Sequence, residues 1–157
     1  MSVKPEGKVL AGMTRRIEIW RKGKLIDVDE KLIDMKDLVV NAGLNALCGQ
    51  AFDSSGGRPA VFNYVAIGQG TTAPAAENTA LENESMRVQG TYAKDAPVGE
   101  CSMDATFNIT ATLALTECGL LNAAAAGTLY CRDTYTVKNV ANGDTVKVYY
   151  TPKFQVP

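Results

Sequence analysis

The sequence predicts an all-β fold, an antiparallel β-sandwich of jelly-roll or immunoglobulin-like type with one short helix. Two observations lead to this prediction. About seven to nine short apolar segments are separated by turn residues, and the clearest of them alternate apolar and polar side chains with period two. With 157 residues, 46% of them hydrophobic, the chain is long enough and apolar enough for one domain around one core.

The first predicted element is a β-hairpin over residues 16–30, with a tight turn at Lys22-Gly23. We expect Arg21 to pair with Lys24 across this turn. That register places four β-branched side chains on one face, Ile17 opposite Val28 and Ile19 opposite Ile26.

One helix is predicted after the hairpin, with Asn41 as its N-cap. Its apolar residues recur with helical spacing and should face the core: Leu44, Leu47, Cys48 and Ala51. A loop over residues 53–60 follows. Residues 61–67 are then apolar on both faces, so we expect a central strand there.

The second half of the chain carries the strongest strand signals. Residues 80–92 read as weaker extended chain, and residues 103–115 alternate apolar and polar side chains without a break. Globular strands seldom run that far, so we expect a bulge or a corner within 103–115. Residues 122–127 should form a loop that joins a hairpin.

The last predicted element is a hairpin whose turn is Asn142-Gly143, a sequence typical of type I′ turns. Pairing Ala141 with Asp144 extends the register outward along the two strands. It places Val137 opposite Val148 and Tyr135 opposite Tyr150.

Charge is concentrated at the start of the chain. Sixteen Lys and Arg and 17 Asp and Glu make 33 charged residues, and 16 of these lie in the first forty positions. No Pro/Gly/Ser linker follows this part. We therefore expect residues 1–35 to form a charge-rich arm and hairpin within the same domain as a sandwich body over residues 36–157.

The composition excludes several classes of function. The chain has no histidine, which excludes Ser-His-Asp and Cys-His hydrolases, histidine-ligated metals and imidazole acid–base catalysis. A net charge of −1 gives no general attraction to nucleic acid. No apolar run approaches the roughly 18 residues of a membrane-spanning helix, and the N-terminus has no signal-peptide pattern. We expect neither nucleic acid nor membrane as a partner.

No residue pattern predicts a catalytic, cofactor-binding or metal site. The sequence at 68–72 lacks the Gly-Lys-Ser/Thr ending of a phosphate loop, and the acidic residues at 27–34 lack calcium-loop spacing. Other carboxylates lie in polar loops, at strand ends or on outward faces: Glu82, Glu84, Glu100, Asp104, Glu117 and Asp144. The cysteines stand singly and should be reduced, buried apolar residues: Cys48, Cys101, Cys118 and Cys131.

The basic residues of the first hairpin form the one candidate contact surface. They are Arg15, Arg16, Trp20, Arg21, Lys22 and Lys24. One aromatic side chain is too few for a nucleic-acid stacking platform. Two interpretations remain open: the cluster contacts a protein partner, or it only keeps an exposed edge strand soluble.

Three segments resemble, in the same order, a pattern found in small β-rich virion proteins of tailed bacteriophages. They are NYVAIGQGTTAPAAENTALENE at 63–84, TECGLLNA followed by GTLYCRD within 116–133, and NGDTVKVYYTPKF at 142–154. With the helix that starts at Asn41, the resemblance covers about residues 36 to 155. Such modules occur as head decoration (cement) proteins and as tail or fibre components.

The resemblance implies a non-enzymatic structural protein of the virion, assembled in the host cytoplasm. The expected role is capsid decoration, with the major capsid protein as partner and a homotrimer as the assembly, and with the hairpin cluster as the tentative capsid contact. One alternative is a tail or tail-fibre component that contacts the host surface or a glycan. An enzyme such as a carboxylate-dependent glycosidase is a third class, which incubation with polysaccharide would test.

Overall fold

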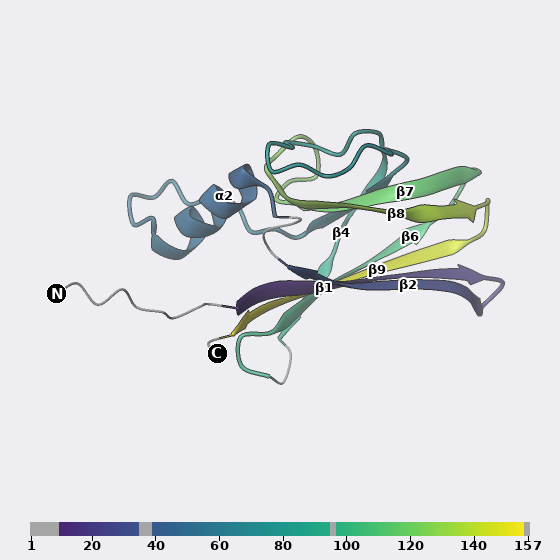
Figure 1. Ribbon diagram of the computed structural model, residues 1–157, viewed down its shortest axis with the longest axis horizontal. Helices are drawn as coiled ribbons and strands as arrows, with labels where there is room; N and C mark the ends of the chain where they lie inside the picture. Colours follow the sequence, from purple (N-terminus) through teal and green to yellow (C-terminus); the bar gives the residue numbers. More distant parts are fainter. Residues whose placement is uncertain (1–9, 35–38, 95–96, 156–157) are drawn as a thin grey trace.

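The computed structural model describes residues 10–34, 39–94 and 97–155, and it shows two antiparallel β-sheets stacked face to face (Figure 1). One sheet has the strand order β2 (Lys24–Asp34), β1 (Leu10–Arg21), β9 (Thr145–Gln155), β6 (Cys101–Asn108) and β5 (Thr91–Lys94). The other has the order β4 (Glu84–Gln89), β3 (Tyr64–Gly68), β7 (Leu113–Leu121) and β8 (Leu129–Val140). Together with a helix, α2 (Asn41–Phe52), these strands confirm the predicted all-β sandwich with one short helix.

The core lies between the sheets, where alternate residues of each strand point inward. Ile17 of β1 and Val148 of β9 come from one sheet, and Ile67 of β3 and Leu115 of β7 come from the other. All four side chains are at most 1% exposed. The period-two pattern of these strands therefore places their apolar side chains in one shared core.

The first hairpin forms at the predicted turn, but its register changes after two pairs. Arg21 pairs with Lys24, and Lys22 and Gly23 both have positive φ, at 50° and 73°, which is the type I′ pattern. A β-bulge at Ile26 then shifts the strand by one residue. The predicted pairs were wrong: Ile17 faces Asp29 and Ile19 faces Asp27, while Val28 and Ile26 are exposed.

The long alternating segment at 103–115 is divided by the expected corner. β6 ends at Asn108 in one sheet and β7 begins at Leu113 in the other. The strand predicted over 61–67 appears as β3, which lies between β4 and β7 and is therefore central in its sheet. The loop at 122–127 joins β7 to β8, as expected.

The predicted hairpin at Asn142-Gly143 was wrong. β8 pairs with β7, whereas β9 pairs with β1 and β6, so Val137 is not opposite Val148 and Tyr135 is not opposite Tyr150. The Asp144 amide does donate to the Ala141 carbonyl. Among the described residues, however, positive φ occurs at Gly143 and not at Asn142, the pattern of a type II turn. The turn is a corner between sheets.

Helix α2 packs through a different face from the one predicted. Its N-cap is Val40 rather than Asn41, and its buried residues are Gly43 and Ala46. A Cβ on Gly43 would lie 2.5 Å from the Tyr130 carbonyl oxygen, so the helix approaches β8 closely through small residues. Three of the four residues predicted to face the core are exposed, namely Leu44, Cys48 and Ala51, and only Leu47 packs on it.

The cysteines do not share one environment, which corrects the expectation that all are buried. All four are free; Cys118 and Cys131 are buried, Cys101 is half-buried and Cys48 is exposed on α2. Burial raises the pKa of the Cys118 thiol to about 12, and the Tyr150 hydroxyl lies 3.1 Å from its sulfur. The two buried thiols therefore stay protonated near neutral pH.

Candidate functional site

The basic cluster of the first hairpin is dispersed by the fold. Arg15 points inward and is only 1% exposed. Its Nε donates to Asp133 of β8 at 2.9 Å and its Nη1 to Asp29 of β2 at 2.6 Å. Arg15 therefore joins the two sheets and cannot be a surface contact, which corrects its assignment to the contact cluster.

The next members of the cluster lie at the surface but are bound to carboxylates of the same chain. Arg16 contacts Glu18 and Glu30, both at 2.8 Å, and the Trp20 indole donates to Glu18 at 2.9 Å. The guanidinium of Arg21 makes two hydrogen bonds to Asp144, both 2.8 Å long. This pairing lowers the pKa of Asp144 to about 2.

Lys22 and Lys24 remain at the exposed β1–β2 turn, and within the described part of the chain neither forms an ion pair. The turn lies at the right-hand end of the sandwich in Figure 1, opposite the end that carries α2. β1 itself lies between β2 and β9, so it is not an edge strand. The edge strand is β2, and of the cluster only Lys24 belongs to it.

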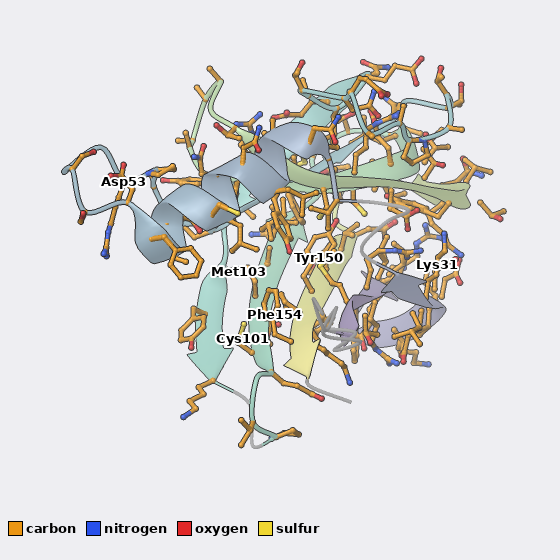
Figure 2. All side chains as sticks on the ribbon, turned by 60° about the vertical axis from the view of Figure 1, so that its left-hand side comes forward. Lys31, Asp53, Cys101, Met103, Tyr150 and Phe154 are labelled. Carbon is orange, nitrogen blue, oxygen red and sulfur yellow. The ribbon has the colours of Figure 1, made fainter. Side chains whose placement is uncertain are left out.

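An apolar hollow lies beneath α2, at the other end of the sandwich. We call it the apolar groove; its volume is about 550 Å³. Its main apolar lining comes from α2, the segment after it, the sheet ends and β8: Leu47, Phe62, Tyr92, Met103, Tyr130 and Phe154. Figure 2 shows Cys101, Met103 and Phe154 on the strands below the helix.

Large apolar side chains around the apolar groove are open to solvent. Two lining residues, Val61 and Tyr92 of β5, are 64% and 61% exposed. Phe52, at the end of α2 and outside the lining, is 84% exposed. Polar groups are few, and one of them, the Gln50 amide, already donates to the Ala60 carbonyl at 2.6 Å. An exposed apolar hollow with such a rim is suited to bury apolar side chains of another protein.

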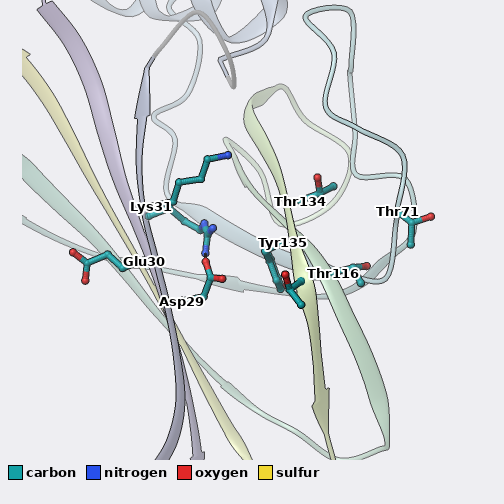
Figure 3. A pocket seen from close by; sticks show the side chains of 9 residues that line it. Asp29, Glu30, Lys31, Thr71, Thr116, Thr134 and Tyr135 are labelled. Atoms are coloured by element: carbon teal, nitrogen blue, oxygen red, sulfur yellow. Dashed lines mark hydrogen bonds and ion pairs between the residues drawn. The ribbon is translucent and has the colours of Figure 1, made fainter.

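A second hollow, the polar cleft, lies between β2 and β8 (Figure 3). Its volume is about 500 Å³, and hydroxyl and charged groups line it: Arg15, Asp29, Glu30, Lys31, Thr71, Thr116, Thr134, Tyr135 and Thr136. Several are engaged within the chain, because Thr116 donates to the Gly70 carbonyl and Tyr135 to the Glu117 carbonyl. The cleft offers hydroxyl groups to a polar ligand.

Sequence reasoning missed a buried ion pair beneath the loop at 69–83. Glu117 is 0% exposed and accepts from the amides of Gly70, Glu82 and Asn83 and from Nε of Arg132. Glu117 does lie on the outward face of its sheet, as expected, but the loop covers that face. No local pattern signals a carboxylate whose partners come from a distant loop.

Asp133 and Asp144 likewise face arginines, Arg15 and Arg21 respectively. Over the described ranges, no group of three or more Cys, Asp or Glu side chains is placed to hold a metal ion. None of the described helical residues forms a helix long and apolar enough to cross a membrane.

Comparison with known proteins gives no match: no protein family, no curated protein and no solved structure is significantly similar to this chain.

Proposed function

We propose that this protein is a non-enzymatic structural component of a tailed-phage virion, a capsid decoration protein that binds the major capsid protein through the apolar groove. The observation that carries the proposal is the apolar groove itself, with its lining residues Val61 and Tyr92 exposed to solvent. Exposed apolar surface of this kind usually marks a contact with another protein.

Three buried carboxylates support a non-enzymatic role. Glu117, Asp133 and Asp144 are each ion-paired with an arginine of the same chain. A buried carboxylate held in this way contributes to the fold and is not open to a substrate. A protein that only adheres to a lattice needs no open carboxylate, and many weak contacts together stabilise a shell by mass action.

The contact is expected to be apolar rather than electrostatic. Arg15, Arg16 and Arg21 are neutralised within the chain, and Lys22 and Lys24 lie at the end remote from the apolar groove. Burying aromatic side chains in a hollow gives most of the affinity in typical interfaces, whereas rim charges mainly change the rate of encounter. Binding to capsids should therefore depend weakly on salt.

Co-sedimentation with capsids assembled without the protein tests the proposal. The double variant Val61→Asp/Tyr92→Asp places two charges on the apolar groove and should weaken binding by about tenfold or more. Both side chains are more than half exposed, so the fold should survive, which thermal unfolding checks.

The matched control, Lys22→Glu/Lys24→Glu, also adds two carboxylates to exposed positions, but at the hairpin turn. It should bind like the parent at every salt concentration. If the control loses binding and the groove variant keeps it, the hairpin turn is the capsid contact. If the parent itself does not sediment with capsids, the decoration role is wrong.

The polar cleft favours a second candidate, a tail or tail-fibre component that binds a glycan. Thr71, Thr116, Thr134 and Thr136 supply hydroxyl groups, and Tyr135 supplies an aromatic ring beside them. Sugars are recognised by such hydroxyl and aromatic groups. Binding of host-surface polysaccharide by the parent, lost in Thr134→Val and kept in Val61→Asp/Tyr92→Asp, would support this candidate over the decoration role.

A further inference from the structure

Strand β2 forms one edge of the five-stranded sheet and is long for an edge strand. It has 11 residues, and in the described part of the chain it pairs with β1 alone. Its outer row of backbone amides and carbonyls is therefore open to another strand. Ile26 is 48% exposed, Val28 39% and Leu32 76%, so the edge also presents aliphatic side chains to solvent.

The sequence of this edge is complementary to itself when read in the opposite direction. Take an antiparallel pairing of two copies in which Asp29 lies opposite Asp29. Ile26 then lies opposite Leu32, an apolar pair, and Asp27 lies opposite Lys31, a pair of opposite charge, whereas Val28 lies opposite Glu30 without such a match. Each of these pairs occurs twice because the arrangement has a two-fold axis.

Neighbouring registers are less favourable. A slip of one residue would place side chains of opposite faces opposite each other. A slip of two residues in one direction places Asp27 opposite Asp29, and like charges directly opposite each other are destabilising. The two-residue slip in the other direction pairs Asp29 with Lys31 but places Glu30 opposite Glu30 and leaves Ile26 without an apolar partner. The register centred on Asp29 pairs Ile26 with Leu32, the two most exposed aliphatic side chains described on this edge.

The central Asp29 pair does not bring two uncompensated charges together. In each copy the Asp29 carboxylate accepts from Arg15 Nη1 at 2.6 Å, and Arg15 is a buried cation. The Asp27 and Lys31 side chains, 46% and 53% exposed, already have partners in their own chain, Lys138 and Asp133. Across the axis the four groups would form a row of alternating charge. Lys138 and Asp27 of one copy come first, and Lys31 and Asp133 of the second copy follow.

We propose that β2 is a homodimerisation edge: two copies pair their β2 strands antiparallel over residues 26–32, around a two-fold axis at Asp29. The β-bulge at Ile26 limits the pairing at one end, and symmetry places Leu32 at the other. Two five-stranded sheets then continue into one another. This pairing gives a dimer, in contrast to the trimer that the resemblance implied.

A mixing experiment tests both the dimer and its register. Ile26→Lys alone and Leu32→Asp alone each replace two apolar pairs per dimer with mismatched ones, so each should raise the dimer Kd by about tenfold. In an equimolar mixture of the two variants, heterodimers place the introduced lysine opposite the introduced aspartate, and they keep one apolar pair of Leu32 with Ile26. The mixture should therefore associate nearly as tightly as the parent. Residues 26 and 32 are too far apart along one strand to contact each other within a chain, so any restored association comes from contact between two copies.

Sedimentation equilibrium is the measurement, with a chain mass of 16.7 kDa as the reference. The control is Val98→Asp, which alters an aliphatic side chain that is 92% exposed outside β2 and should leave the Kd unchanged. Thermal unfolding confirms that each variant is folded. A parent that stays a monomer up to about 1 mM overturns the proposal. So does a trimer that Leu32→Asp leaves intact, or a mixture that associates no better than either single variant.

Discussion

At the scale of single residues, the charges that the fold buries are the ones that join its parts. Arg15 joins β1 to β8, and the Arg132–Glu117 pair joins β7 and β8 to the loop at 69–83. Removing one partner of a buried ion pair leaves an uncompensated charge in the interior, which is more costly than losing a surface pair.

Glu117→Ala should therefore lower the free energy of unfolding by about 3 to 5 kcal/mol. The variant leaves Arg132 without its closest carboxylate and leaves three loop amides without an acceptor. Urea unfolding measures the change. Glu30→Ala, which removes an exposed pair with Arg16, is the control and should cost less than about 1 kcal/mol. Equal losses of unfolding free energy in the two variants would contradict the role of Glu117 as the buried link between the strands and the loop at 69–83.

The Arg21–Asp144 pair predicts a pH dependence of stability. Hydrogen bonds from Arg21 and from the Ala141 amide lower the pKa of Asp144 to about 2 in the folded protein, below its value of 3.8 in the unfolded chain. A lowered folded-state pKa stabilises the fold above the unfolded value, and this stability is lost as pH falls from about 4 to about 2.

The parent should accordingly exceed Asp144→Asn in stability at pH 7, and the difference should shrink as pH falls through that window. Chemical unfolding at several pH values measures the difference, and taking the difference removes the titration of other carboxylates. Arg21→Gln, which removes the other member of the pair, should likewise be less stable than the parent at pH 7. Its stability difference from the parent should also shrink as pH falls. A difference between parent and Asp144→Asn that stays constant down to pH 2 would show that the pairing is absent in solution.

The sequence contained a pattern that predicts the burial of Arg15, although charged residues are usually exposed. Arg15 stands between Met13 and Ile17 with period two, so the alternation of β1 places it on the inward face. The carboxylates that make this burial possible, Asp29 and Asp133, come from two other strands. Which charges find buried partners depends on sheet topology, and local pattern does not reveal that topology.

At the scale of elements, the turn residues predicted correctly where the chain reverses. They did not predict as reliably which strands pair on either side of the turn. Lys22-Gly23, the weaker turn sequence, forms the hairpin with positive φ at both positions. Asn142-Gly143, the stronger sequence, forms a corner between sheets. The strand that follows a turn pairs with whichever strand buries its apolar face, and for β9 those strands are β1 and β6.

The turn type at this corner predicts different costs for its two residues. Gly143→Ala should destabilise the protein by about 1 kcal/mol, since φ is +89° there and nothing lies within 4 Å of an added Cβ, so the cost is backbone strain alone. Asn142→Ala should cost little, because Asn142 does not need positive φ. Thermal unfolding measures both. Similar losses for the two variants would indicate a type I′ turn instead.

The helix shows the same limit. Its position and length were predicted within a residue or two, but its apolar spacing indicated the wrong face. Gly43 and Ala46 allow close contact with β8, and this contact turns Leu44 and Cys48 outward. The apolar groove beneath α2 exists because of this packing, so the sequence alone could not have located it.

At the scale of the whole molecule, the two candidate capsid contacts lie at opposite ends. The apolar groove and α2 lie at one end of the sandwich, and the hairpin turn with Lys22 and Lys24 lies at the other (Figure 1). The β2 edge, proposed as the dimer contact, runs along one side between these ends. A dimer formed there would leave the apolar groove of each copy free for a shell.

The central claim is that the end carrying α2 binds a capsid. Electron cryo-microscopy of capsids incubated with the protein tests it most directly, because it shows both the place and the orientation of the bound molecule. We predict density on the outer surface of the head, with α2 and the apolar groove facing the shell and the β1–β2 turn pointing away. Density on the tail alone, or a bound molecule whose α2 end faces solvent, would contradict the account.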